Sequence, residues 1–175
     1  MRRLVALTPL AALTVLVAIF AGWSLHRETH VAPTALIGKS LPALTLSSLD
    51  TGAPTALRST IKGPVLINVF ASWCGPCAEE APALAALKAE GASIIGIAYK
   101  DAPTATAAFL GRYGNPYQQV LVDRDGRAGI DLGATGVPET LAVDGNGVIR
   151  GKWALPLTPD AAEALLKQAS RPAGR

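Results

Sequence analysis

The chain has 175 residues, of which half are hydrophobic, and its formal net charge at pH 7 is +3. This length allows one ordinary domain with a small appendage, and such a domain buries a core without needing disulfides. The charge is mild and no long basic run with interleaved aromatic residues occurs, so we do not expect binding to nucleic acid.

The N-terminal segment predicts a membrane anchor. The run at 4–25 contains no charged residue, and as a helix it would reach about 33 Å, against a hydrocarbon thickness of about 30 Å. Arg2 and Arg3 precede the run, so we expect residues 1–3 in the cytoplasm, a single-pass signal anchor at 4–25, and export of the rest. A cleaved signal peptide is the alternative, but its apolar region is usually shorter, and no clear small-x-small site follows Phe20.

The remaining chain divides into three parts. Residues 26–38 are interpreted as a linker, 39–170 as the folded domain and 171–175 as a flexible tail. His26 and His30 lie four residues apart, but no third metal ligand is evident near them. We therefore interpret them as polar residues that follow the membrane segment.

The folded domain alternates between short apolar runs and helical periods. The expected elements are, in chain order, a strand at 65–70, a helix at 76–88, a strand at 93–98, a helix at 103–113 and a strand at 118–122. The sequence DGNG at 144–147 then predicts a turn between two strands, and Thr158 with Pro159 predicts a capped closing helix. This order predicts an α/β fold with a mixed central sheet and helices on both faces, which is the thioredoxin pattern.

The only two cysteines, Cys74 and Cys77, lie where the strand at 65–70 should turn into a helix. The N-terminus of that helix would stabilise a thiolate at Cys74, and Cys77, one turn later, could attack a mixed disulfide. Gly75 and Pro76 let the turn close and the helix start without blocking access to Cys74. A staple across two residues would add little stability, and zinc would need two more soft ligands, so a redox pair is favoured.

A second part of the site is expected far along the chain. Val137 precedes Pro138 after a loop, at the start of a predicted strand. In thioredoxin-like proteins a proline here is cis and packs beside the cysteines, and the residue before it offers backbone hydrogen bonds to an extended substrate. An ordinary loop proline is the alternative.

The chain resembles the CcmG/DsbE family, which are membrane-anchored thiol-disulfide oxidoreductases of cytochrome c maturation. The resemblance is carried by NVFASWCGPCAEE around the cysteines, YKD at 99–101, GNPY at 114–117 and PET at 138–140. It covers nearly the whole chain. It implies a bacterial inner-membrane protein with its catalytic domain on the periplasmic side.

The resemblance also implies roles for acidic residues. Ordinary thioredoxin has a buried aspartate six residues before its first cysteine, where this chain has Asn68, whose amide cannot accept the proton of a buried thiol. Glu80 and Glu139 are the acidic residues implied for the site, and either could deprotonate Cys77. The alternatives are a solvated helix position for Glu80 and a loop or strand-edge charge for Glu139. The residues expected to contact substrate are Trp73, Gly75, Pro76, Val137 and Pro138.

The activity implied by the resemblance is protein-disulfide reduction. Cys74 would attack the disulfide of an apocytochrome c CxxCH segment, and Cys77 would displace the reduced product, with no metal or organic cofactor. Apocytochrome c or another maturation protein is implied as electron acceptor, and a CcdA- or DsbD-type membrane reductase as donor. The alternatives are a related anchored reductase with another exported client, an oxidant or isomerase, and a non-redox adaptor in cytochrome c assembly.

Overall fold

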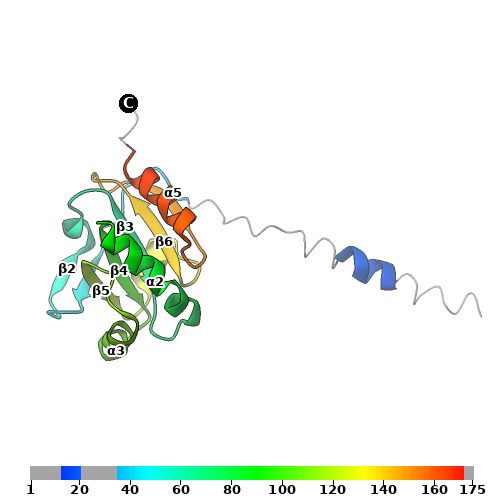
Figure 1. The fold of residues 1–175 in the computed structure, drawn as a ribbon, viewed down its shortest axis with the longest axis horizontal. Coiled ribbons are helices and arrows are strands. Elements are labelled where there is room, and N and C mark those ends of the chain that lie inside the picture. The colour runs from blue at the N-terminus through cyan, green and yellow to red at the C-terminus, as the bar shows by residue number, and fades with distance from the viewer. Residues whose placement is uncertain (1–12, 21–34, 172–175) are drawn as a thin grey trace, which may run out of the picture. The chain divides into compact units, whose positions relative to one another are not determined.

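The computed structural model of the chain describes residues 13–20 and 35–171 (Figure 1). Residues 13–20 form a helix within a separate N-terminal unit, and the folded domain belongs to the unit Pro33–Arg175. Among the described residues, no helix is long and apolar enough to cross a membrane. The rest of the predicted anchor at 4–25 lies outside the described residues, so the anchor stays a prediction.

A seven-stranded mixed sheet forms the centre of the domain (Figure 1). Its strands are β1 (Thr45–Ser48), β2 (Pro54–Ala56), β3 (Val65–Phe70), β4 (Ile94–Tyr99), β5 (Gln119–Asp123), β6 (Glu139–Val143) and β7 (Ile149–Trp153). Their spatial order is β2-β1-β5-β4-β3-β6-β7. The central strands β3, β4 and β5 run parallel, and every other neighbouring pair is antiparallel. Strand β3 is buried along its whole length, as expected of a strand that is apolar at every position except Asn68.

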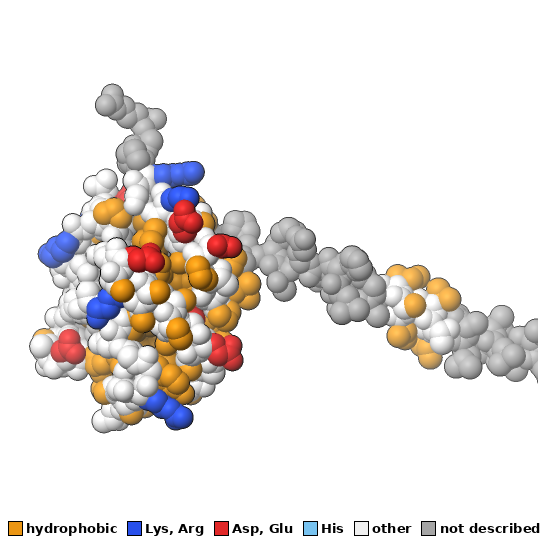
Figure 2. Space-filling view, viewed as in Figure 1, with side chains coloured by type: hydrophobic (Ala, Val, Ile, Leu, Met, Phe, Trp, Pro, Cys, Tyr) orange, Lys and Arg blue, Asp and Glu red, His pale blue; other side chains and the backbone are white. Residues whose placement is uncertain are grey.

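The two faces of the sheet are covered differently. The long helices α2 (Gly75–Ala89), α3 (Pro103–Tyr113) and α5 (Pro159–Ala169) bury their apolar side chains in one core, which includes Leu66 and Phe70 of β3. Figure 2 shows charged side chains of both signs among apolar ones on the surface seen there. The second core lies under the 3-10 helix η1 (Leu57–Thr60), and the five-residue helix α4 (Arg127–Asp131) contacts β4 and β5.

The thioredoxin-like α/β fold predicted from the sequence is confirmed. Each expected strand and helix is present, with bounds that differ from the prediction by one residue at most for the strands and helices given as ranges. The cap of α5 is also confirmed, because the Thr158 hydroxyl accepts the backbone N–H of Ala161 at 3.3 Å. The prediction omitted β1, β2, η1 and α4. These elements have three to five residues each and too few positions to show a period.

Gly96 in the middle of β4 leaves the space that an aromatic ring fills. A Cβ at this position would lie 2.8 Å from Cδ2 of Tyr117. The Tyr117 ring stacks on Phe70 with 4.9 Å between the ring centroids. The missing side chain at Gly96 therefore lets a tyrosine lie flat against the sheet, on the face that carries α2.

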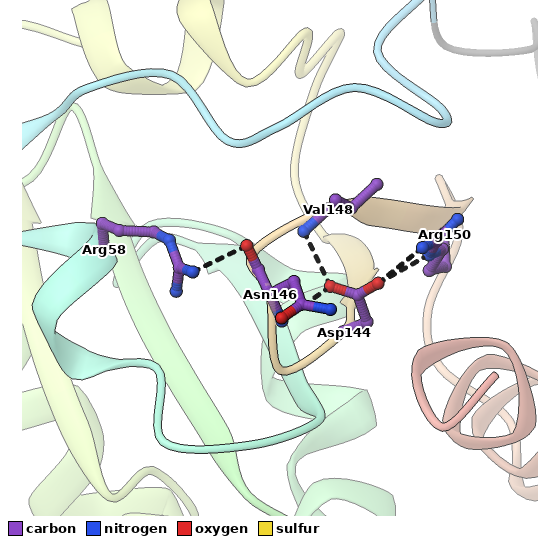
Figure 3. Close-up of polar contacts among 5 residues, drawn as sticks. All are labelled: Arg58, Asp144, Asn146, Val148 and Arg150. Atoms are coloured by element: carbon purple, nitrogen blue, oxygen red, sulfur yellow. Dashed lines mark hydrogen bonds and ion pairs between the residues drawn. The ribbon is translucent and has the colours of Figure 1, made fainter. Parts of the chain in front are cut away.

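Asp144 closes the turn between β6 and β7 (Figure 3). Its Oδ1 accepts the backbone N–H groups of Asn146 and Val148, each at 2.9 Å, and its Oδ2 pairs with Arg150 at 2.7 Å. Arg58 of η1 donates to the Asn146 carbonyl at 2.6 Å and ties η1 to the turn. Burial works to raise the pKa of Asp144, but the hydrogen bonds from Val148, Arg150 and Asn146 outweigh it and hold the pKa below its ordinary value.

Candidate redox site

Cys74 and Cys77 form a disulfide at the N-terminus of α2. Cys74 is the N-cap residue, and its sulfur accepts the backbone N–H of Cys77 at 3.1 Å. Gly75 and Pro76 form the first helical positions, where the missing N–H of proline leaves no hydrogen bond unmade. After reduction, the same N–H group and the positive end of the helix dipole would stabilise a thiolate on Cys74.

The two cysteines differ in their position relative to α2. In the disulfide state both are buried, with 5% of Cys74 and 2% of Cys77 exposed. Cys74 is the N-cap residue between the exposed Trp73 and Gly75, whereas Cys77 lies inside the first turn, so the position favours Cys74 as the sulfur that meets another protein. Cys77, inside the first turn of α2, is in position to attack the Cys74 sulfur from within the protein.

The peptide bond between Val137 and Pro138 is cis, as predicted. It directly precedes β6, which pairs with β3, the strand that leads to the cysteines. A pocket of about 220 Å³ is lined both by this loop and by Pro76 of α2. The structure thus brings together two segments that lie about sixty residues apart in sequence, and the substrate-binding role of Val137 and Pro138 stays a prediction.

Trp73 is the most prominent apolar side chain beside the disulfide. It is 60% exposed, and its indole Nε1–H donates to the Lys100 carbonyl at 3.3 Å. An exposed aromatic ring that is fixed at one end offers apolar contact area at little cost in conformational entropy. This position suits the predicted contact with substrate.

Glu80 is buried on the face of α2 that also carries Cys77, three residues earlier. Only 2% of Glu80 is exposed, and its carboxylate accepts the Leu157 N–H at 2.8 Å and the Asn68 side-chain amide at 2.9 Å. Burial raises the pKa of Glu80, and these two hydrogen bonds only partly oppose the rise. A carboxylate with a raised pKa near a buried thiol is suited to accept its proton.

Asn68 links Glu80 to a wider buried network. Its amide group also donates to the Thr140 hydroxyl at 3.0 Å, and its carbonyl accepts the Tyr117 hydroxyl at 2.7 Å. Burial, together with the negative charge of Glu80, raises the pKa of Tyr117 well above its ordinary value, so the phenol remains a donor. Asn68, which stands where thioredoxin has an aspartate, thus orients Glu80, and Glu80 supplies a carboxylate on this side of the sheet that can accept a proton.

Glu139 lies on the other face of the sheet. Asn68 pairs with Thr140 in the register of β3 and β6, and both side chains face α2, so the neighbouring Glu139 points away from it. Its Oε2 pairs with Lys152 at 2.7 Å, and both side chains are buried. Its Oε1 accepts the backbone N–H groups of Thr135 and Gly136 at 2.9 and 3.2 Å. The structure brings Glu139 to the cis-proline loop and does not bring it together with Glu80.

The side chains of Tyr117 and Lys152 carried no role in the sequence analysis. Tyr117 lies in the GNPY segment, which is typical of the family, but its hydrogen bond to Asn68 depends on how β4 and β5 pair. Lys152 could not be singled out from the sequence, because whether a lysine on a strand is buried depends on how that strand pairs with its neighbour. Among the described residues, no group of three or more His, Cys, Asp or Glu could hold a metal ion; His26 and His30 lie outside them.

Sequence comparison identifies relatives over most of the chain. Residues 36–166 match the Redoxin family. The chain is 40% identical to the thiol:disulfide interchange protein DsbE of Pseudomonas fluorescens biotype C, over 87% of this chain and 85% of that protein. It is 39% identical to DsbE of Escherichia coli K12, over 95% and 94% of the two chains. It is 41% identical to HelX of Rhodobacter capsulatus, over 77% of each.

Solved structures show the same fold. The structure of MTB dsbF has a TM-score of 0.64 at 23% identity and covers 71% of this chain and 93% of its own. A secreted Mycobacterium tuberculosis disulfide oxidoreductase has a TM-score of 0.62 at 22% identity, over 71% of this chain and 95% of its own. With its CxxC disulfide at a helix N-terminus, the chain belongs to the Redoxin family and, within it, to the thiol-disulfide oxidoreductases named DsbE and HelX.

Proposed function

We propose that this protein is a membrane-anchored periplasmic reductase of the disulfide in the CxxCH segment of apocytochrome c. It would act on that segment directly or through another cytochrome c maturation protein. The observation that carries the proposal is the Cys74–Cys77 disulfide at the start of α2, with the buried carboxylate of Glu80 one turn further along the helix. The membership of the DsbE and HelX family supports it.

The first step uses the reduced form of the pair. The Cys74 thiolate attacks one sulfur of the client disulfide; a Cys74–client disulfide forms, the client S–S bond breaks, and the second client sulfur leaves as a thiolate. Trp73, Gly75, Pro76 and the cis-proline loop contact the client chain, and the Val137 backbone pairs with it as an added strand.

The second step releases the client. Glu80 accepts the proton of the Cys77 thiol, the resulting thiolate attacks the Cys74 sulfur, and the mixed disulfide breaks. The client leaves with both thiols free for haem attachment, and the Cys74–Cys77 disulfide is restored. Two electrons pass to the client in one cycle. Glu139 is assigned a different part, because its contacts hold the loop that carries Pro138.

A continuing supply of electrons is a requirement of this reaction. An exported dithiol works in an oxidising compartment, where disulfides form and persist. We propose a membrane reductase of the CcdA or DsbD type as the donor that returns the Cys74–Cys77 disulfide to the dithiol. No metal or organic cofactor takes part in the exchange.

The anchor is proposed from the N-terminal sequence. The run at 4–25 is uncharged and follows two arginines, which favours insertion with the N-terminus in the cytoplasm. The described helix within this run exposes the large apolar side chains Leu13, Val15, Leu16, Val17, Ile19 and Phe20. A lipid environment would cover them, so the charge-free run and this helix both support an inner-membrane location.

The test is capture of the client in a bacterium that assembles c-type cytochromes. The full chain with Cys77→Ala cannot complete the second step and should hold its client through Cys74; the matched control carries Cys74→Ser as well. Disulfide-linked apocytochrome c, or a cytochrome c maturation protein, is the expected product. Recovery of other exported proteins alone would identify a reductase with another client. Undiminished cytochrome assembly with Cys74→Ser would identify a non-redox adaptor.

A further inference from the structure

One buried carboxylate fastens the turn before Cys74 to the loop after β4. Asp101 is 6% exposed, and its Oδ2 accepts the backbone N–H of Ser72 at 2.7 Å. Its Oδ1 accepts the Ser72 hydroxyl and the Ala102 N–H, each at 2.8 Å. Because both oxygens are engaged and Ala102 fixes the carboxylate to its own loop, Ser72 is held by its main chain and its side chain together.

A second contact joins the same two segments. The Lys100 carbonyl accepts the Trp73 indole N–H at 3.3 Å, next to the Ser72–Asp101 contacts. Lys100 has φ of 48°, and among the described residues it is the only one other than glycine with positive φ. Lysine rarely adopts this conformation, and it persists only where its surroundings hold it. Here the Lys100 N–H donates to the Asp123 carbonyl at 2.8 Å, which fixes the loop to the end of β5.

We infer that Asp101 is a positioning residue for the nucleophile: it fixes Ser72, and through Ser72 the turn that keeps the Cys74 sulfur against the Cys77 N–H. Ser72 lies two residues before Cys74, and within the same turn the Cys74 N–H donates to the Ala71 carbonyl at 3.2 Å. Without the clamp, the turn could rotate and carry the sulfur away from the helix N-terminus. The inference concerns thiol-disulfide exchange itself and does not depend on which client is reduced.

The negative charge of Asp101 and its hydrogen bonds to Ser72 have opposite effects on the thiolate fraction of Cys74, so the two can be separated by experiment. A negative charge near the site disfavours a thiolate, so its removal in Asp101→Asn would by itself increase the thiolate fraction of Cys74. Loss of the clamp would decrease that fraction, because the helix N-terminus would no longer face the sulfur. Ser72→Ala removes one clamp contact and leaves the charge at Asp101 in place.

The matched control is Asp144→Asn. Asp144 is also a buried carboxylate that holds a turn through two backbone N–H groups (Figure 3). It follows Val143, which pairs with Val65 at the start of β3, whereas the cysteines follow the other end of that strand. A change that results only from a weakened turn should therefore be seen in this control as well.

The experiment measures the rate at which iodoacetamide alkylates Cys74 in the reduced full chain between about pH 5 and 9, with the modified residue identified by mass. At about pH 6.5 we expect Ser72→Ala and Asp101→Asn to react about three- to tenfold more slowly than the wild type, because a smaller fraction of Cys74 is then thiolate. Asp144→Asn should react at the wild-type rate, although its melting temperature should fall.

Two results would overturn the inference. Faster alkylation in Asp101→Asn, together with a wild-type rate in Ser72→Ala, would mean that Asp101 acts through its charge alone. Wild-type rates in both variants, with lower melting temperatures only, would mean that the clamp is merely structural. If Asp101→Asn does not fold, Ser72→Ala tests the inference by itself, because it keeps the carboxylate: slower alkylation supports the clamp, and a wild-type rate overturns it. None of these readouts uses cytochrome assembly, so a failure of the proposed client would not affect them.

Discussion

Replacing Glu80 by glutamine tests the proposed proton acceptor without changing its volume. The two oxygens of the wild-type carboxyl group accept one hydrogen bond each, at 2.8 Å from Leu157 N–H and at 2.9 Å from the Asn68 amide, and both oxygens can still accept when the group is protonated at acidic pH. Glutamine has only one acceptor oxygen, so one of these two buried N–H donors would face the glutamine NH₂ group and lose its hydrogen bond. One unsatisfied buried donor costs about 1–3 kcal/mol, which is the expected loss of unfolding free energy at acidic pH.

The stability difference should also depend on pH. The pKa of Glu80 is raised in the folded protein, chiefly by burial, so its contribution to stability is fully present below the ordinary glutamate value of 4.5. That contribution is lost as the pH rises through the higher folded value, whereas glutamine does not titrate. We expect the wild type to lose its advantage over Glu80→Gln as the pH rises above about 4.5, measured by urea denaturation at a series of pH values.

The kinetic effect should fall on the second step only. A positioned acid or base typically contributes about 10²–10⁴-fold, so resolution of the mixed disulfide in Glu80→Gln should slow by at least about 10²-fold. Rapid mixing of the reduced protein with an oxidised CxxCH peptide, followed by acid quenching, separates the two steps. The mixed disulfide should form at the wild-type rate and then accumulate. Glu79→Gln, at the exposed residue just before Glu80, is the control and should resolve normally. Resolution at the wild-type rate in Glu80→Gln would refute the assignment of Glu80 as proton acceptor.

Two further substitutions test how the site is supported. Gly96→Ala would place a Cβ 2.8 Å from the Tyr117 ring and should lower the free energy of unfolding by about 1–3 kcal/mol, measured by urea denaturation. Gly111→Ala is the control, because its Cβ meets nothing within 4 Å and should not destabilise the protein. Equal effects of the two substitutions would contradict the close packing at Gly96. Lys152→Met would leave the buried Glu139 carboxylate without its ion-pair partner and should cost about 3–5 kcal/mol by the same assay, and a loss below about 1 kcal/mol would show that the pair does not hold the loop.

The sequence predicted the parts of the site that depend on local pattern. The apolar run at 65–70 indicates a strand buried on both faces, and the cysteines follow it at the point where a helix must begin. The spacing of Cys77 and Glu80 places both on one side of that helix, as the structure has them. The proline at 138 was predicted to be cis from the resemblance to thioredoxin-like proteins, and it is.

Contacts between distant strands could not be predicted in the same way. The side of the sheet to which Glu139 points follows from the pairing of β6 with β3, and a shift of one residue would reverse it. Its partner Lys152 is on β7, beyond the hairpin turn. Asp101 was part of a segment typical of the family, but its hold on Ser72 depends on the parallel pairing of β3 with β4. These contacts involve side chains, and spacing along the chain carries no information about them.

The central claim is that Cys74 is the sulfur that attacks the client. It is tested most directly by mass analysis of the intermediate that is acid-quenched when the reduced wild-type chain meets an oxidised CxxCH peptide. We predict a short-lived adduct joined to Cys74, which decays as the Cys74–Cys77 disulfide forms and the peptide dithiol is released. An adduct on Cys77, or peptide reduction without any adduct on Cys74, would contradict the account.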